Sequence, residues 1–150
     1  MSELKARLFK LCKEAIDQRI AHAKETLDLA QESANDETKS SAGDKHETGR
    51  AMAQLEAEKA TNQLNESLEL RTSLDRIDPS MVTESVTVGS LVISKTTKFL
   101  ICVSAGKLEL GGTVYFAISP ESPIGKLLLG KKKGDSITFN GITHEILEVS

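Results

Sequence analysis

The chain has 150 residues, of which 39% are hydrophobic and 27% are charged, and its mean hydropathy is -0.23. This composition is typical of a folded protein in water and excludes a disordered tail or a disulfide-rich miniprotein. No apolar run approaches the roughly 18 residues that a membrane span needs. Charged residues also interrupt the N-terminal segment, where a secretory signal would be continuously apolar. We therefore expect a cytoplasmic protein with no membrane partner.

The formal net charge of -3 is divided between two unlike halves. Residues 1–78 contain 12 basic and 16 acidic side chains, whereas residues 79–150 contain 7 and 6. Neither half has the concentrated basic face of a nucleic-acid-binding protein. Aromatic residues make up 3% of the chain, with no tryptophan, so base-stacking platforms have little to be built from. Direct nucleic-acid binding is therefore not the leading hypothesis.

Cys12 and Cys102 are far apart in the sequence and belong to no Cys-x-x-Cys motif. In a reducing compartment such residues usually behave as small buried hydrophobic side chains. We expect neither a disulfide nor a catalytic thiol.

The first half of the chain predicts two long helices. Residues 2–34 contain no glycine or proline, and their apolar residues recur at intervals of three and four. The pattern returns over residues 44–77, after the turn-rich connection NDETKSSAGD. Two helices joined by a short connection form an antiparallel hairpin, so we expect a coiled-coil hairpin over residues 1–78 with its tip near residues 35–47. The expected apolar seam consists of Leu4, Leu8, Leu11, Cys12, Ile16, Ile20, Ala23, Leu27, Ala30, Ala34, Ala53, Ala57, Ala60, Leu64, Leu68, Leu74 and Ile77.

The second half predicts a small sheet domain. Asp78-Pro79 ends the helical pattern, since the residue before a proline is biased out of the helical region, and residues 79–85 form a linker. Over residues 86–150 we expect short strands at VTVGSLVIS, KFLICVS and TVYFAIS, with the intervening AGKLELGG as a turn. The domain is expected to be an antiparallel sheet packed with one helix, which makes the fold class α+β.

Local signals place the helix and the last hairpin of this domain. In SPIGKLLLG, Ser122 suits the cap, Pro123 suits the first helical position, and Gly130 suits the left-handed position after the helix. Asn140-Gly141 is a strong hairpin signal and divides the C-terminal segment into two strands.

The sequence lacks the motifs of a self-contained enzyme. His22, His46 and His144 have no partners at metal-ligand spacing, and His144 is expected to be a sheet residue with a local hydrogen bond. No GxSxG, Walker or GxGxxG motif occurs. We therefore expect a protein that is not itself an enzyme.

Two acids stand out at the predicted tip. Asp44 and Glu47 are separated by three residues in the first turn of the second helix, so their side chains share one face. This spacing is also that of a capping box, in which the acids only stabilise the start of the helix. Alternatively, the two carboxylates could present a Mg²⁺ ion, provided that a partner completes its ligand shell.

Two stretches of the sequence resemble the bacterial Gre-type transcript cleavage factors. GDKHE at residues 43–47 is similar to the Gly-Asp-x-x-Glu tip of that family. ISPESPIGKLLLGKKKGD at residues 118–135 is similar to its ISxxSPIGxxLxGKxxGD signature. The resemblance covers nearly the whole chain and implies a coiled-coil hairpin followed by an FKBP-like domain over residues 86–150.

The resemblance also implies a function. Family members dock on RNA polymerase at its secondary channel and insert the hairpin, whose tip acids help to hold a catalytic Mg²⁺ for the polymerase's own cleavage of backtracked RNA. By this resemblance Asp44 and Glu47 take the catalytic and metal-positioning roles, with Mg²⁺ shared with the polymerase. The expected polymerase-binding residues are Ser122, Pro123, Lys126 and Lys131. We expect a monomer that contacts nascent RNA indirectly.

Three alternatives stay open at this point. The family tip continues with Asn and then an aromatic residue, where this chain has Thr48, Gly49 and Arg50; the chain could therefore be a Gre-fold modulator or inhibitor that does not stimulate cleavage. Prolyl isomerase activity would need an aromatic pocket, for which this domain offers few residues. A holdase or dimeric scaffold would need apolar surface at the tip, and NDETKSSAGDKHE has none.

Overall fold

The computed structural model describes residues 2–39 and 43–150, apart from the side chains of residue 2 and residues 36–47. The chain forms two compact units, which we describe separately. One unit is residues 16–69, and the other combines residues 1–15 with residues 70–150. The divisions lie within the helices, whereas the sequence predicts a hairpin over 1–78 and a domain from 86.

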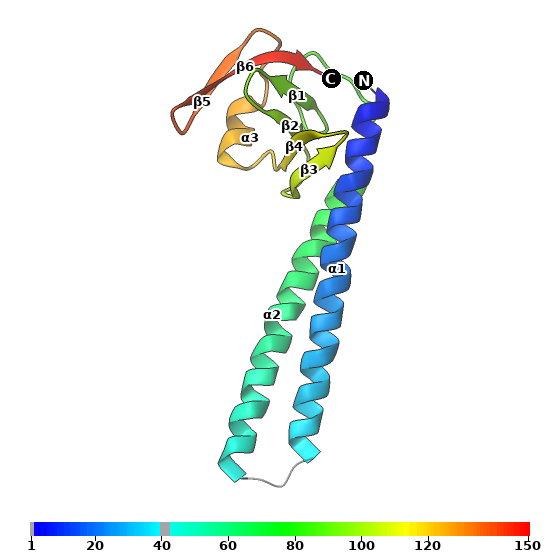
Figure 1. Ribbon diagram of the computed structural model, residues 1–150, viewed down its shortest axis with the longest axis vertical. Coiled ribbons are helices and arrows are strands. Elements are labelled where there is room, and N and C mark those ends of the chain that lie inside the picture. The colour runs from blue at the N-terminus through cyan, green and yellow to red at the C-terminus, as the bar shows by residue number, and fades with distance from the viewer. Residues whose placement is uncertain (1, 40–42) are drawn as a thin grey trace. The chain divides into compact units, whose positions relative to one another are not determined.

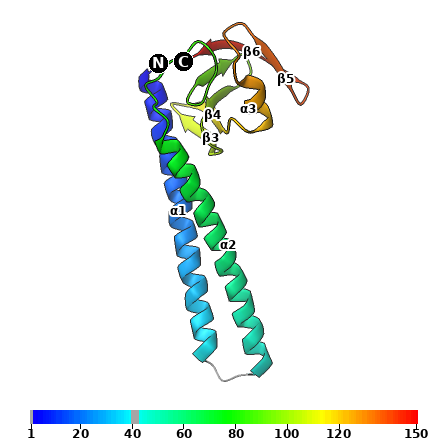
Figure 2. The ribbon, with the colours of Figure 1, turned by 180° about the vertical axis from the view of Figure 1, so that it is seen from behind.

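The two predicted helices are α1 (Ser2–Lys39) and α2 (Gly43–Asp75). Within the unit of residues 16–69 they lie side by side along their length (Figures 1 and 2). The hairpin predicted from the spacing of apolar residues is confirmed.

Residues at intervals of seven, most of them alanines, are buried along both helices. Ile16, Ala23 and Ala30 are buried on α1, and Ala53 and Ala60 are buried on α2. A seven-residue repeat is the signature of coiled-coil packing, since it keeps one stripe of a helix facing its partner. Alanine at these positions makes the seam narrow and leaves little room for larger side chains.

The seam departs from the sequence prediction at one position. Leu68 is 42% exposed, and the preceding Ser67 is 7% exposed. Ser67 lies seven residues after Ala60 and seven before the buried Leu74, so the repeat places the serine on the seam. The prediction of Leu68 as a seam residue is therefore wrong, because position in the repeat decided burial here and hydrophobicity did not.

The narrow seam makes a prediction about Ala60. Ala60→Leu adds volume at a position that is 1% exposed, and we expect it to lower the free energy of unfolding by about 1–3 kcal/mol. The matched control is Ala51→Leu, the same change at an exposed position of α2, which should alter that free energy by less than about 0.5 kcal/mol. Urea denaturation followed by circular dichroism measures both. Equal effects would show that Ala60 is not tightly packed.

The second unit contains a six-stranded sheet with the strand order β3-β4-β2-β1-β6-β5. Its strands are β1 (Leu91–Ser94), β2 (Lys98–Ile101), β3 (Gly106–Leu110), β4 (Thr113–Ile118), β5 (Ser136–Phe139) and β6 (Ile142–Val149). The short helix α3 (Pro123–Leu128) follows β4.

The sheet differs from the prediction in three ways. Residues 106–110 form β3, an edge strand paired along its length with β4, although the sequence predicted a turn there. The predicted strand over 86–94 is formed only from Leu91 onward. The β2–β4 pair is parallel, in a sheet predicted to be antiparallel, because the chain crosses from β2 to the sheet edge before it returns as β4.

The core of this unit joins the sheet to α3. Its buried members are Val86, Val92, Phe99, Ile101, Leu128, Ile137 and Ile146. Leu128 is the contribution of α3 and is fully buried. The Asn140-Gly141 turn is confirmed: Asn140 and Gly141 have φ angles of 51° and 78°, the left-handed pair that joins β5 to β6.

His144 of β6 is buried and its Nδ1 hydrogen-bonds with the Thr96 hydroxyl, which confirms the predicted structural role. The edge of its ring also meets the Phe99 ring, at a centroid distance of 5.5 Å.

Among the residues that the structure describes, no helix is long and apolar enough to cross a membrane.

Candidate functional site

The two acids of the predicted tip lie in the first turn of α2. This helix begins at Gly43, so Asp44 is its second residue, inside the helix rather than at its cap, and Glu47 lies three residues further on. Positions three apart on a helix share one face. The side chains of both acids lie outside the described part of the structure, so their role as metal ligands stays a prediction. In the described part of the chain, no three His, Cys, Asp or Glu side chains are grouped as a metal site.

The second predicted site is the segment of residues 118–135, which we call the signature segment. Ser122 caps α3: its hydroxyl accepts a hydrogen bond from the backbone nitrogen of Gly125 at 3.1 Å and donates one to the carbonyl of Ser119 at 2.6 Å. Pro123 follows at the first helical position, and Gly130 has a φ of 82° after the helix. The predicted cap, helix start and helix end are all confirmed.

Gly125 controls the shape of this segment. A Cβ atom at Gly125 would lie 2.1 Å from the backbone oxygen of Ser119 and 2.8 Å from the hydroxyl oxygen of Ser122. Backbone atoms cannot move away as a flexible side chain can, so only glycine allows α3 to approach the loop after β4. The Ser119 hydroxyl donates to Glu121 at 2.6 Å and accepts from the backbone nitrogen of Glu121 at 3.1 Å, which further restricts the loop.

The tight loop leaves one part of α3 exposed. Pro123 and Lys126, two of the predicted polymerase-binding residues, are exposed at positions three apart. Leu127 and Leu129 are exposed too, and the sequence analysis missed them. A contiguous exposed apolar patch is typical of a protein-binding surface. The run LLLG in the sequence indicated this exposed apolar surface. Three consecutive leucines at the end of a short helix point in different directions, so they cannot all enter the core.

The other two predicted binding residues have structural roles. Both hydrogen bonds of the Ser122 hydroxyl are made within the loop, so this side chain shapes the surface. Lys131 is half-buried, and its carbonyl oxygen accepts a hydrogen bond from the backbone nitrogen of Val86 at 2.8 Å. Lys132 and Lys133, which follow it, are exposed.

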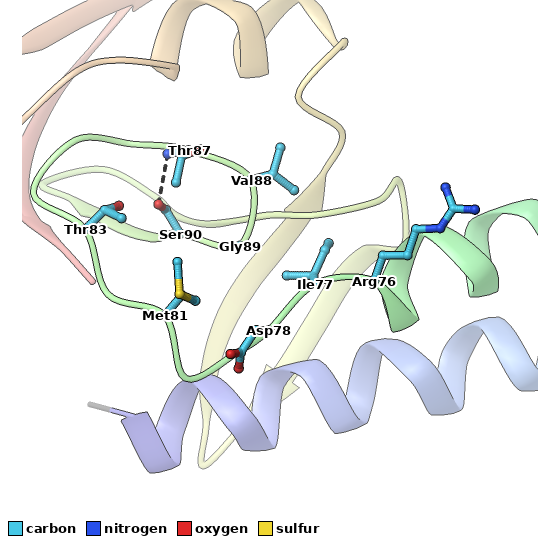
Figure 3. Close-up of a pocket in the computed structure, with 9 residues that line it drawn as sticks. All are labelled: Arg76, Ile77, Asp78, Met81, Thr83, Thr87, Val88, Gly89 and Ser90. Atoms are coloured by element: carbon cyan, nitrogen blue, oxygen red, sulfur yellow. Dashed lines mark hydrogen bonds between the residues drawn. The ribbon is translucent and has the colours of Figure 1, made fainter.

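A cavity of about 390 Å³, which the sequence analysis did not predict, lies beside the loop before β1. Figure 3 shows Ile77, Met81 and Val88 among its lining residues, while the Arg76 side chain extends away from them. The Ser90 hydroxyl accepts a hydrogen bond from the backbone nitrogen of Thr87 at 2.9 Å and holds this loop. Met81 is 61% exposed. The lining is therefore largely apolar and partly open to solvent.

A second cavity, of about 400 Å³, shares Arg76, Ile77 and Val88 with the first. Its lining extends to the loop of residues 119–121 in the signature segment. The two cavities are therefore neighbours, and together we call them the groove.

A charged pair lies at the margin of the groove. Lys5 is 1% exposed and donates a hydrogen bond from Nζ to the Met81 carbonyl at 2.6 Å. Burial lowers the pKa of Lys5, and the Asp78 carboxylate partly opposes this shift. Hydrogen bonds from the hydroxyl and the backbone nitrogen of Ser80 hold the pKa of Asp78 below its usual value. These contacts attach the start of α1 to the loop that borders the groove.

Gly125→Ala tests the close contact in the signature segment. The added methyl group would meet the Ser119 carbonyl, so we expect the free energy of unfolding to fall by about 3 kcal/mol. The neighbouring Lys126→Ala, at an exposed position, should change it by less than about 0.5 kcal/mol. Thermal unfolding of the two variants and the wild type provides the comparison, and a fully stable Gly125→Ala would contradict the assigned contact.

Comparison with known proteins agrees with this geometry. Residues 83–150 match the family model described as "Transcription elongation factor, GreA/GreB, C-term". A solved structure titled "Structure of the transcription factor Gfh1" is 22% identical, over 92% of this chain and 91% of that one, with a TM-score of 0.39. No curated protein matches the chain.

The matched residues contain all six strands, α3 and the signature segment. The match therefore covers the whole sheet domain with its tightly capped helix. Residues 83–150 are thus similar to the C-terminal domain of the GreA/GreB factors.

Proposed function

We propose that this protein binds RNA polymerase through the secondary channel and stimulates the polymerase's own cleavage of backtracked RNA. The observation that carries the proposal is the match of the C-terminal domain to the GreA/GreB family. It is supported by the position of Asp44 and Glu47 in one turn at the start of α2. The protein itself is then an accessory factor, and the catalytic centre belongs to the polymerase.

Asp44 and Glu47 would position a Mg²⁺ ion in the polymerase active site. Mg²⁺ is commonly held by one or two protein carboxylates, with water and substrate phosphates as its other ligands. Two acids therefore suffice only where a partner supplies the remaining ligands, as a two-metal phosphoryl site does. Nascent RNA would meet the factor only through this shared site.

The exposed part of α3 would be the contact with the polymerase. Pro123, Leu127 and Leu129 offer apolar surface, and Lys126 adds a positive charge among them. Apolar anchors supply affinity at an interface, while a cation steers the approach of a negatively charged partner. The groove beside the signature segment extends the apolar surface.

The second candidate is a factor of the same fold that binds polymerase without stimulating cleavage. The residues after Glu47 support this second candidate. The chain has Thr48-Gly49-Arg50 where the family's tip has Asn and then an aromatic residue. Docking through α3 would be common to both candidates, which differ only in what the tip does.

Asp44→Asn separates the two candidates. Asparagine keeps the size of aspartate but removes the charge that Mg²⁺ needs. With stalled, backtracked complexes of the cognate polymerase, we expect the wild type to accelerate RNA cleavage and Asp44→Asn to lose at least about 90% of that stimulation, as removal of a metal-positioning carboxylate requires.

Asp36→Asn serves as the matched control, since it removes an acid from the other helix of the same hairpin. Its stimulation should equal that of the wild type at equal thermal stability. A wild type that binds polymerase and leaves cleavage unchanged would establish the second candidate instead.

Lys126→Glu tests the docking surface. Reversing this charge should weaken binding to the polymerase about tenfold, mainly through a slower association rate at low salt. Lys107→Glu, an exposed charge reversal on β3, is the control and should bind as the wild type does. Surface plasmon resonance with immobilised polymerase measures both, and equal affinities would exclude the exposed part of α3 from the interface.

A further inference from the structure

The two cysteines of the chain, far apart in the sequence, are in contact in the structure. The sulfur of Cys12 on α1 lies 3.8 Å from the sulfur of Cys102, which follows β2. Cys12 is fully buried, and Cys102 is 4% exposed. Both are thiols in the structure. The sequence analysis expected two separate buried side chains and missed this contact, since no spacing rule connects a helix residue to a position 90 residues later.

This arrangement is close to that of a disulfide. Bonded sulfurs lie about 2.05 Å apart, so the two atoms need to approach by less than about 2 Å. Cys102 is held in place by a hydrogen bond from its backbone nitrogen to the Ile118 carbonyl at 2.8 Å. Cys12 lies between the buried Leu8 and Ile16 on the same helix. Small side-chain rotations would therefore close the bond without unfolding either element.

A route for a reagent leads to this pair. Cys102 lines the 400 Å³ cavity, together with Ser73, Arg76 and Ser104. The cavity is partly open to solvent, and its lining carries one cationic and one anionic side chain, Arg76 and Glu121. Contact with the Cys12 thiol and burial both raise the pKa of Cys102. The thiolate is therefore scarce at neutral pH, and the reaction should be slow and faster at higher pH.

We propose that Cys12 and Cys102 are a site of reversible disulfide formation, which covalently links α1 to the sheet domain when the chain meets a low-molecular-weight disulfide. One cysteine, as its thiolate, attacks a sulfur of the reagent and releases one thiol, leaving a mixed disulfide. The second cysteine loses its proton and attacks the protein sulfur of that mixed disulfide, which releases the second thiol. Two protein thiols are thereby oxidised, one reagent disulfide is reduced to two thiols, and the two protons go to the leaving groups.

The bond would restrict the start of α1. It would close a loop that contains the rest of α1, all of α2, and β1 and β2. A crosslink over a loop of this length stabilises a protein mainly by restricting its unfolded chain. This inference is independent of the proposed function, because it concerns only contacts within the chain.

The test uses the purified full chain and oxidised glutathione at pH 8, followed by alkylation and mass spectrometry. We expect a monomer that has lost two hydrogen atoms and yields one linked peptide containing Cys12 and Cys102. The same sample should melt roughly 10 °C higher than the reduced protein, and dithiothreitol should abolish the difference. Comparing oxidised with reduced wild type requires no variant to fold.

Cys12→Ala and Cys102→Ala provide matched controls, since alanine leaves no unpaired polar group in the core. Neither should show the dithiothreitol-sensitive rise in melting temperature. The proposal is overturned if both wild-type thiols remain alkylatable, if only glutathione adducts or intermolecular dimers form, or if the linked monomer melts no higher than the reduced one.

Discussion

The seven-residue repeat of small side chains is the constraint on which the hairpin depends. Each buried alanine contributes little hydrophobic free energy, at about 0.8 kcal/mol per methyl-sized group, so close approach of the backbones has to compensate. This requirement explains why Ser67 is buried while Leu68 is exposed. The seam also determines which face of α2 is turned away from α1. Asp44 and Glu47 lie at the start of the helix that this seam aligns.

The sheet domain depends on a different kind of contact. Gly125 lets α3 approach the Ser119 carbonyl, and the Ser122 hydroxyl closes the same loop from within. Leu128 then enters the core, and the helix is too short to bury Leu127 and Leu129 as well. The exposed surface offered to a partner is therefore a consequence of how the loop is closed. Of the four residues expected to bind the partner, Pro123 and Lys126 are exposed, and Ser122 and Lys131 are half-buried.

The contact between Cys12 and Cys102 points to disulfide chemistry, although the two residues form no sequence motif. Cys12 and Cys102 each fit the general preference of cysteine for the protein interior, and each alone would carry no further meaning. Their contact joins the first helix to the sheet within one compact unit. The start of α1 is held there by a second interaction, the hydrogen bond from Lys5 to the Met81 carbonyl. Residues 1–15 therefore pack as part of the sheet unit, although they belong to a helix of the hairpin.

The sequence by itself determined the features that local chemistry controls. Apolar periodicity predicted both long helices, Ser122 and Pro123 predicted the start of α3, and Asn140-Gly141 predicted the last hairpin, because each depends on residues within a turn or two. Motif similarity provided the resemblance to the Gre-type factors and singled out the two acids of the tip. The side chains of those acids lie outside the described residues, so their role stays a prediction.

Only the tertiary structure decided the features that depend on long-range pairing. The parallel β2–β4 pair, β3 as an edge strand, the groove beside the signature segment and the contact between the two sulfurs all join segments distant in the chain. Residue spacing carries no information about such pairings, since they are selected by which surfaces can be buried together.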